Sequence, residues 1–436
     1  MIDSKEFARR RRDLMSMIGK NSIAVITAAP ERQRSRDTHF PYRQDSDFYY
    51  LSGFPEPEAV LVLVPGRKQG EFIVFCRDRD PDREIWDGYR AGPEGACADF
   101  GANDAFPIND IDEILPGLLE DKERVYYAVG KDREFDQHLM GWINDIRARA
   151  RTGAVPPGEF VDLDHLLHEM RLFKKPAEIK LMRKAGKISA AAHCRAMRAV
   201  RPGMREFELQ AELEHEFAKA GASYPAYTSI VGGGGNACVL HYITNQDELN
   251  DGDLVLIDAG CEYQHYAADI TRTFPVNGKF STEQKAIYEI VLEAQQAAIE
   301  TVQVGNTWDQ PHQATVEIIT AGLVQLGLLK GKVKDLIEKN AYTRFYMHRA
   351  GHWLGMDVHD VGDYKVDNQW RMLEPGMVMT VEPGIYISPN DTKVAKKWRG
   401  IGIRIEDDVL LTRKGPEVLT AGVPKTVADI EAFMAG

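Results

Sequence analysis

The stretch DLVLIDAGCEYQHYAADITRTF, residues 253–274, decides the fold of the C-terminal half of this chain. Its first part, Asp253–Glu262, opens with an uninterrupted run of leucine, valine and isoleucine, which predicts a strand buried on both faces. Its second part, His265–Phe274, is rich in β-branched and aromatic residues and predicts a second strand. The two runs together predict an antiparallel hairpin that turns at Tyr263-Gln264.

The hairpin carries two carboxylates, Asp258 and Asp269, one on each predicted strand. With a turn at Tyr263-Gln264, Asp258 lies directly opposite Asp269, and directly opposed side chains are about 5 Å apart at Cβ. A buried carboxylate needs a partner, and two like charges held this close repel unless one is protonated or cations lie between them. The pair favours a cation site, and the alternative is that one carboxylate is merely solvated near the turn.

Two more carboxylates occupy comparable settings nearer the C-terminus. Glu382 closes the apolar run that starts at Met377 and is followed by Pro-Gly, which stops a strand. Glu406 lies in the run Gly402–Leu410, where the alternation of side chains places Arg404 on the same face. Arg404 is therefore expected to reach the site that contains Glu406.

Three histidines, His348, His352 and His359, lie within twelve positions among glycines and apolar residues. A lone histidine is more often a satisfied core residue, but three histidines beside four carboxylates indicate chemistry. Four carboxylates balance two divalent cations, and Arg404, His348 and His359 are available to offset a bridging hydroxide and the charge of a transition state. Oxygen ligands with one imidazole and no thiolate favour manganese, although cobalt, zinc or iron would also fit.

The predicted centre suits amide hydrolysis. Two metal ions roughly 3.5–4 Å apart lower the pKa of a bridging water, polarise a carbonyl and hold an amine or a leaving group. A phosphoesterase could use similar metal ions, so the ligands alone leave phosphate chemistry open.

The motifs around these residues resemble those of the pita-bread metallopeptidases. Within that family the chain is most similar to bacterial Xaa-Pro aminopeptidases, also called aminopeptidase P, over nearly all of its length. The segment PYRQDSDFYYLSGFPEPE from Pro41 is more distinctive of this subfamily than the metal motifs are. The matching metal motifs are Asp-Ala-Gly at Asp258, Asp-Ile-Thr-Arg-Thr-Phe from Asp269, His-x-x-x-His-x-x-Gly-x-x-x-His-Asp-Val-Gly from His348, Glu-Pro-Gly from Glu382 and Arg-Ile-Glu-Asp around Glu406.

The resemblance implies a role for each metal ligand. Asp258 would bind one metal ion, Asp269 and Glu406 would bridge both ions, and His352 with Glu382 would complete the second. Glu382 would also carry the proton of the bridging water. The choice of His352 among the neighbouring histidines comes from the resemblance alone.

The resemblance also implies residues that contact the substrate. His359 and His348 would orient the substrate carbonyl and the prolyl side of the scissile bond, and His241 matches a further active-site histidine. By itself His241 would be an ordinary strand histidine beside a glycine turn. The sequence departs from the family at Arg349, where glycine is usual, and at His265, where a small residue is common; Arg349 would either narrow the substrate entrance or point to solvent.

Composition is typical of a large enzyme that binds neither nucleic acid nor membrane. The chain has 436 residues, is 44% hydrophobic and carries a net charge of −12, which disfavours polyanionic partners. No apolar run approaches the roughly 18 residues of a membrane span, and no signal core follows Met1. Five scattered cysteines predict reduced thiols and a cytoplasmic protein. The basic cluster Arg9–Arg12 is expected to form the solvated face of a helix.

Two domains are expected, with a boundary between residues 174 and 175. Residues 1–174 alternate predicted strands with predicted helices, which indicates an α/β N-terminal domain. Residues 175–436 combine strand-borne ligands with amphipathic helices and predict an α+β catalytic domain, which by resemblance has the pita-bread fold. The predicted elements are strands at 23–27, 59–64 and 72–76, helices at 108–119, 135–150 and 161–173, a helix starting at Pro176, and helices with capping boxes at Ser281–Gln284 and Thr307–Gln310.

The predicted function is removal of the N-terminal residue from peptides whose second residue is proline. Such peptides are the expected partners, together with further copies of the chain in a homodimer or homotetramer. Trp86 and Asp37 are candidates for contacting substrate across a subunit boundary, or are ordinary loop residues. The alternatives are a prolidase, which cleaves Xaa-Pro dipeptides with the same ligands, and a binding module that has lost its metal ions.

Overall fold

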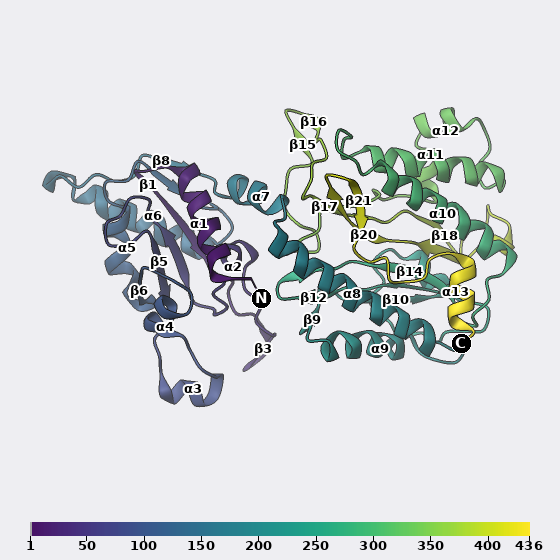
Figure 1. Cartoon of the computed structure of the whole chain (residues 1–436), viewed down its shortest axis with the longest axis horizontal. Helices are drawn as coiled ribbons and strands as arrows, with labels where there is room; N and C mark the ends of the chain where they lie inside the picture. The colour runs from purple at the N-terminus through teal and green to yellow at the C-terminus, as the bar shows by residue number, and fades with distance from the viewer. Residues whose placement is uncertain (1) are drawn as a thin grey trace. The chain divides into compact units, whose positions relative to one another are not determined.

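A computed structural model describes residues 2–436 and divides them into two compact units, one ending at Met170 and the other beginning at Arg171. The first unit is an α/β structure and the second is an α+β structure (Figure 1). Among the described residues, no helix combines the length and the apolar character that crossing a bilayer requires.

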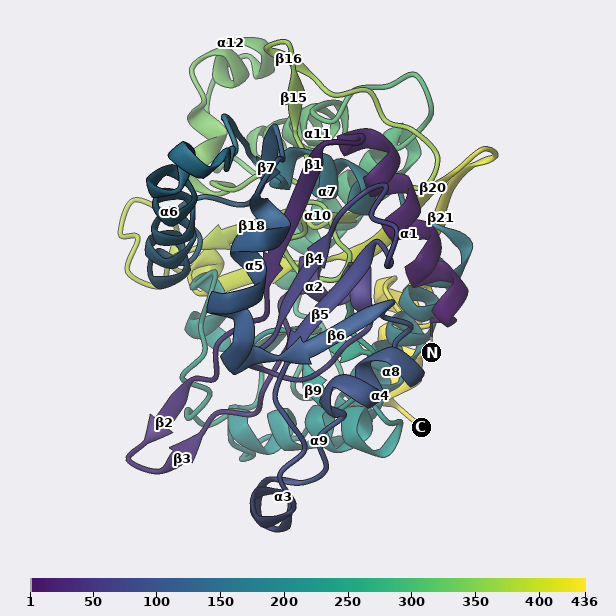
Figure 2. The same ribbon diagram turned by 90° about the vertical axis from the view of Figure 1, so that its left-hand side faces the viewer.

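The first unit is built on a six-stranded sheet with the order β6-β5-β4-β1-β7-β8. Strand β1 runs antiparallel to β4 and parallel to β7, and Figure 2 shows β1, β4, β5 and β6 side by side. The predicted strands and helices of this unit are confirmed within a few residues. The elements are α1 (Ser4–Ile18), β1 (Ser22–Thr27), β2 (Gln33–Ser35), β3 (Thr38–His39), α2 (Ser46–Ser52), β4 (Val60–Leu63), β5 (Phe72–Cys76), α3 (Pro81–Asp87), α4 (Gly92–Ala98), β6 (Asp104–Pro107), α5 (Ile111–Leu119), β7 (Arg124–Tyr126), α6 (Arg133–Ala148), β8 (Glu159–Val161) and α7 (Asp164–Leu172), which crosses into the second unit.

Helices α5 and α6 cover one face of this sheet. Leu115 of α5 and Ile143 of α6 share a hydrophobic cluster with Ile23 and Val25, which point to the same face because side chains alternate along a strand. This cluster explains why the apolar runs of the N-terminal half form an independent core.

The prediction that Arg9–Arg12 form a solvated helix face is wrong for Arg10 and Arg11, which are buried. Arg10 is 0% exposed and Arg11 is 6% exposed. Arg10 Nη1 donates to the carbonyl of Tyr50 at 3.0 Å, and Arg11 Nη1 donates to the carbonyl of Leu51 at 2.7 Å. These carbonyls belong to the last turn of α2, where the backbone has no helical donors, so the two arginines satisfy them.

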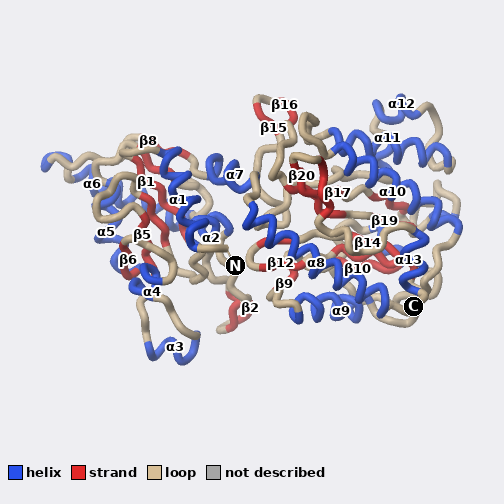
Figure 3. Tube along the Cα trace, in the orientation of Figure 1, coloured by secondary structure: helices blue, strands red, loops and turns tan. Residues whose placement is uncertain are grey.

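The second unit places helices around several short antiparallel sheets (Figure 3). Strand β11 pairs with β10 and β14, β20 pairs with β17 and β21, and β18 pairs with β19. A single hydrophobic cluster joins Ile188 of α8 and Val291 of α10 to Ile257 and Ile403 of the strands. The elements are α8 (Pro176–Ala199), α9 (Glu206–Lys219), β9 (Tyr224–Pro225), β10 (Ile230–Gly233), β11 (Leu254–Asp258), β12 (Cys261–Tyr263), β13 (Tyr266–Ala267), β14 (Thr271–Pro275), α10 (Thr282–Thr301), α11 (Gln310–Gln325), α12 (Val333–Glu338), β15 (Lys365–Val366), β16 (Gln369–Trp370), β17 (Val378–Val381), β18 (Gly384–Ile387), β19 (Ile401–Arg404), β20 (Asp407–Thr412), β21 (Gly415–Val418) and α13 (Val427–Met434).

The predicted hairpin forms, but its register differs from the expectation. Asp258 pairs with Thr271, not with Asp269. The turn is at Gln264-His265, whose φ angles of 51° and 66° place both residues in the left-handed backbone region that a two-residue type I′ hairpin turn requires. A shift of two residues leaves every side chain on its original face, so Asp258 and Asp269 still share one face.

Of the two predicted capping boxes, one is complete. Ser281 and Gln284 exchange both hydrogen bonds at the start of α10. At α11 the side chain of Gln310 accepts from the backbone N–H of Thr307, but the helix begins at Gln310 and its N-cap is Asp309. The expected start at Thr307 is therefore wrong by two residues.

Candidate metal centre

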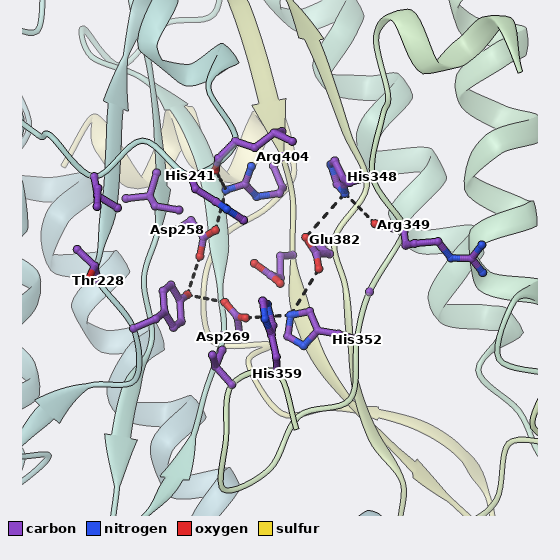
Figure 4. Close-up of a pocket in the computed structure, with 17 residues that line it drawn as sticks. Thr228, His241, Asp258, Asp269, His348, Arg349, His352, His359, Glu382 and Arg404 are labelled. Atoms are coloured by element: carbon purple, nitrogen blue, oxygen red, sulfur yellow. Dashed lines mark hydrogen bonds and ion pairs between the residues drawn. The ribbon is translucent and has the colours of Figure 1, made fainter. Parts of the chain in front are cut away.

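The expected metal ligands come from strand ends that converge on one cavity. Asp258 ends β11 and Asp269 precedes β14, while Glu382 follows β17 and Glu406 links β19 to β20. His352 lies in the irregular segment that precedes β15. All five side chains line a cavity of about 430 Å³ (Figure 4).

Asp269, His352 and Glu406 form the centre of the cluster, because one ligand atom from each lies within 4.8 Å of the others. His352 Nε2 is 3.4 Å from Asp269 Oδ2 and 3.6 Å from Glu382 Oε1. Its Nδ1 is 2.9 Å from the carbonyl of Trp353, which assigns the proton to Nδ1 and leaves Nε2 facing the carboxylates. This is the orientation that a metal-binding imidazole requires.

Asp258 joins the cluster through Tyr227, a residue that no sequence motif singled out. The Tyr227 hydroxyl lies 2.6 Å from Asp258 Oδ1 and also contacts Asp269 Oδ1. Arg404 Nη2 is 2.6 Å from Asp258 Oδ2. Tyr227 lies in an irregular segment after β9, so neither periodicity nor spacing marked it.

Glu406 is held by two neighbours, Thr271 and Arg272, and Arg404 in turn binds Thr271. Thr271 Oγ1 donates to Glu406 Oε2 at 2.6 Å, and Arg404 Nε donates to the same Thr271 Oγ1 at 3.1 Å. Arg272 Nη1 donates to the Glu406 carbonyl, and its Nη2 is 2.7 Å from Asp407 Oδ1. The segment that follows Asp269 thus fixes the other end of the cluster.

The remaining candidate residues lie around the cluster. The rings of His352 and His359 are 4.3 Å apart between centroids. His348 Nε2 is 2.9 Å from the Tyr386 hydroxyl, which also accepts from Arg404 Nη1 at 3.0 Å. His241 lines the cavity and is exposed.

Arg349 borders the cavity but its side chain points away from the carboxylates (Figure 4). Its guanidinium lies over the ring of Trp370, 4.7 Å from the centroid. Of the two alternatives for Arg349, a side chain that points to solvent fits better than one that narrows the substrate entrance, because Arg349 is exposed.

The pKa values show that this cluster of carboxylates needs positive charge. Burial and the neighbouring charges of Asp269 and Glu382 hold the pKa of Glu406 well above its ordinary value. Burial raises the pKa of Glu382 to about 7, although His352 and Arg404 oppose the shift. Burial lowers the pKa of His352, but Asp269 and Glu382 outweigh it and raise this pKa to about 9.

The donor set fits divalent cations. Four carboxylates and one imidazole converge, and beside them lies Arg404, which is already paired with Asp258. Cations between the carboxylates would remove the repulsion that raises the pKa of Glu406. Hard or borderline ions suit oxygen ligands with one imidazole.

Comparisons with known proteins agree with this site. Residues 180–413 match the model of metallopeptidase family M24, and residues 7–126 match that of the aminopeptidase P N-terminal domain. The chain is 49% identical to the Xaa-Pro aminopeptidase of Escherichia coli (strain K12), covering 99% of this chain and 98% of the relative. The structure of Pseudomonas aeruginosa aminopeptidase PepP matches with a TM-score of 0.99 and 64% identity, covering 100% of this chain and 98% of that chain.

Fold and site together define a metal-dependent peptidase, with an α/β N-terminal domain and a pita-bread catalytic domain. The chain belongs to the Xaa-Pro aminopeptidases of metallopeptidase family M24. It is a hydrolase that releases the N-terminal residue from peptides with proline in the second position. The prolidase alternative is not favoured, since the matched relatives are aminopeptidases over their full length.

Proposed function

We propose that two divalent metal ions, manganese in the cell, are held by Asp258, Asp269, His352, Glu382 and Glu406. The observation that carries the proposal is the central position of Asp269 and Glu406, whose carboxylates lie within reach of His352. Asp258 and Glu382 flank this centre through Tyr227 and His352, respectively. Asp269 and Glu406 would therefore bridge the ions, with Asp258 on one and His352 with Glu382 on the other.

Glu382 is proposed to move the proton of the attacking water. Bound metal ions would supply Lewis-acid activation of that water and of the scissile carbonyl. The Glu382 carboxylate lines the cavity in which that water would bind, and a proton acceptor must lie within hydrogen-bond reach of the proton that it takes. Thr380 Oγ1 donates to Glu382 Oε1 at 3.3 Å, which keeps the carboxylate directed into the cavity.

His348, His359 and His241 are proposed to bind the peptide around the scissile bond. Burial lowers the pKa of His348 to about 4, and burial together with the charge of His352 lowers that of His359. Both imidazoles are therefore neutral near pH 7, and that of His359 can donate a hydrogen bond to a substrate carbonyl. The Nδ1 proton of His348 already faces the Arg349 carbonyl at 2.7 Å, so His348 would contact the prolyl side of the peptide without donating to it. Arg404 is proposed to keep Asp258 ionised and oriented, because its guanidinium is buried against that carboxylate.

Proline in the second position explains why a dedicated site is needed. The proline nitrogen carries no N–H and its φ is fixed, so enzymes that hold an extended peptide by backbone hydrogen bonds handle it poorly. The cavity instead offers apolar side chains, Ile230, Leu240, Ile243 and Val358, beside the histidines. Peptides with Xaa-Pro N-termini are thus the proposed partners, in line with an Escherichia coli aminopeptidase P solved in complex with substrate.

Hydrolysis of Xaa-Pro-Yaa tripeptides, measured against Xaa-Pro dipeptides with manganese, with zinc and with a chelator, tests this function. We expect tripeptide cleavage with manganese, little dipeptide cleavage, and loss of activity once the chelator has removed the metal ions. Zinc is included because a zinc-substituted Escherichia coli aminopeptidase P is known. Undiminished activity after removal of metal ions would contradict the proposed chemistry, and higher activity with zinc would overturn the choice of manganese.

Manganese binding is expected to strengthen as the pH rises from about 6 to about 8, because metal ligands bind in their deprotonated form. Glu382, with a pKa of about 7, loses its proton over this range, and His352, with a pKa of about 9, loses it more readily at the upper end. Calorimetric titration of the protein, after a chelator has removed its metal ions, should show Kd falling by about a hundredfold over this range, because each proton released on binding lowers Kd about tenfold per pH unit. A Kd that stays constant would mean that these two groups do not bind the metal ion.

We also propose that the chain assembles into a homodimer or homotetramer in the cytoplasm. Helix α3 and the segment after it support assembly because Ile85 and Trp86 of the helix and Tyr89 beyond it are 79%, 84% and 91% exposed, and large exposed apolar side chains mark contact surfaces. Asp37 lies in the exposed turn between β2 and β3, which is a second candidate contact. The cysteines are free thiols, as a reducing compartment requires. Light scattering and cell fractionation would test the two proposals.

A further inference from the structure

The loop from His352 to Gly362 carries two residues of the site, yet only its first part is held by a strand. The backbone of Thr380 donates to the His352 carbonyl at 2.9 Å, and Leu354 donates to the Val378 carbonyl at 3.0 Å. These bonds attach the His352 end of the loop to β17. The part that carries His359 must be fixed by something else.

Asp360, the residue after His359, is placed to fix this part of the loop. Its side chain is 1% exposed, with Oδ1 at 2.6 Å from Arg171 Nη2 and Oδ2 at 2.9 Å from Lys174 Nζ. Its backbone N–H donates to the Trp353 carbonyl at 2.9 Å, and the N–H of Asp357 donates to Oδ1 at 3.4 Å. Asp360 therefore closes the loop on itself and ties it to Arg171 at the end of α7 and to Lys174 in the segment that follows α7.

The charges around Asp360 balance. Arg171 Nη2 also lies 2.7 Å from Asp357 Oδ2, so two cations face two carboxylates. The side chains of Arg171 and Lys174 are 2% and 1% exposed, which means that neither can turn to water in exchange for this contact. Burial alone would raise the pKa of Asp360, but Lys174 and Arg171 lower it, and the carboxylate stays ionised.

Gly355 shows how closely the loop is packed on this carboxylate. A Cβ atom on Gly355 would lie 2.0 Å from Asp360 Oδ2 and 2.9 Å from Lys174 Cε. Such a distance is far inside van der Waals contact, so any side chain at this position would displace the ion pair. The need for glycine at position 355, in the His-x-x-Gly motif, therefore comes from its contact with Asp360 and not from the metal site.

We infer that Asp360 is a positioning residue, which together with Arg171 and Lys174 holds the loop so that His359 stays against the substrate side of the metal centre. His359 precedes Asp360 directly, and its ring packs 4.3 Å from that of His352. The inference rests on the proposed role of His359. It adds that the catalytic geometry of His359 depends on two cations, Arg171 at the end of α7 and Lys174 between α7 and α8.

A double-mutant cycle between Asp360→Asn and His359→Ala tests the inference, with kcat and KM for an Xaa-Pro-Yaa tripeptide, metal content and Tm measured for each variant. We expect Asp360→Asn to lower kcat by about 10²-fold, the size of effect that a misplacement near 1 Å produces, with two metal ions retained per chain. In the His359→Ala background the same substitution should have little further effect on kcat, because its action passes through His359. Asp363→Asn, an exposed carboxylate of the same loop, is the matched control and should behave as the native protein.

Lys174→Gln provides a second variant in case Asp360→Asn does not fold, since it leaves the pair between Asp360 and Arg171 in place. It should lower kcat in the native background and have little effect beside His359→Ala. Additive effects in the cycle, or a folded, metal-replete Asp360→Asn with native kcat, would overturn the inference. His359→Ala with native kcat would instead overturn the proposed role of His359 itself.

Discussion

Replacing Glu382 with glutamine is expected to lower kcat by at least about 10³-fold, which lies within the range that a general base contributes. Glutamine has nearly the same volume, but it cannot accept the proton of the attacking water and it neutralises one of four convergent carboxylates. The backbone N–H of Glu382 donates to the Ala350 carbonyl at 2.8 Å, and this bond does not depend on the side chain. The variant should therefore fold normally.

Steady-state kinetics with an Xaa-Pro-Yaa tripeptide, together with Tm and metal content, distinguish loss of the proton acceptor from loss of structure. We expect kcat to fall while Tm, compared in the metal-free state, stays close to that of the native protein. Glu338→Gln is a suitable control, because Glu338 is an exposed glutamate of α12. Near-native turnover in Glu382→Gln would remove Glu382 from both of its proposed roles.

The sequence predicted the carboxylates best where a strong strand pattern ends in an acidic residue. Uninterrupted apolar runs place Asp258 and Glu382 at the ends of β11 and β17, because a buried strand leaves few other positions for a charge. The register of the hairpin was predicted wrongly because it depends on Gln264 and His265 adopting positive φ angles, which are uncommon in residues other than glycine.

Residues whose role depends on tertiary contacts could not be predicted from the sequence. Tyr227 reaches Asp258 and Asp269 from an irregular segment, and no spacing relates it to them. The sequence predicted Arg10 as a surface residue, because no pattern in it shows that the Tyr50 carbonyl at the end of α2 accepts from Arg10. Asp360 is part of a motif that the resemblance matched, yet its partners Arg171 and Lys174 lie 189 and 186 residues earlier in the chain.

Asp269→Asn is expected to abolish activity through a different route, by removing both metal ions. Asp269 lies at the centre of the cluster: its Oδ2 is 3.4 Å from His352 Nε2, and its Oδ1 shares Tyr227 with Asp258. Its backbone N–H is held by both oxygens of Asp408, each at 3.2 Å, so the strand stays in place after the substitution. Asp269 is proposed to bridge the two ions, so an amide in its place would remove the negative charge that both ions would share.

The contrast with Asp258→Asn makes this prediction specific. Asp258 flanks the centre, so its amide variant should lose one metal ion and keep the other, whereas Asp269→Asn should retain neither at micromolar manganese. A ligand that binds only the folded state raises Tm, so manganese should raise the Tm of the native protein and leave that of Asp269→Asn unchanged. Elemental analysis after dialysis, paired with thermal scans with and without manganese, would measure both effects. Equal metal loss in the two variants would argue against a bridging Asp269. Loss of a ligand that binds both ions should release more metal than loss of a ligand that binds one.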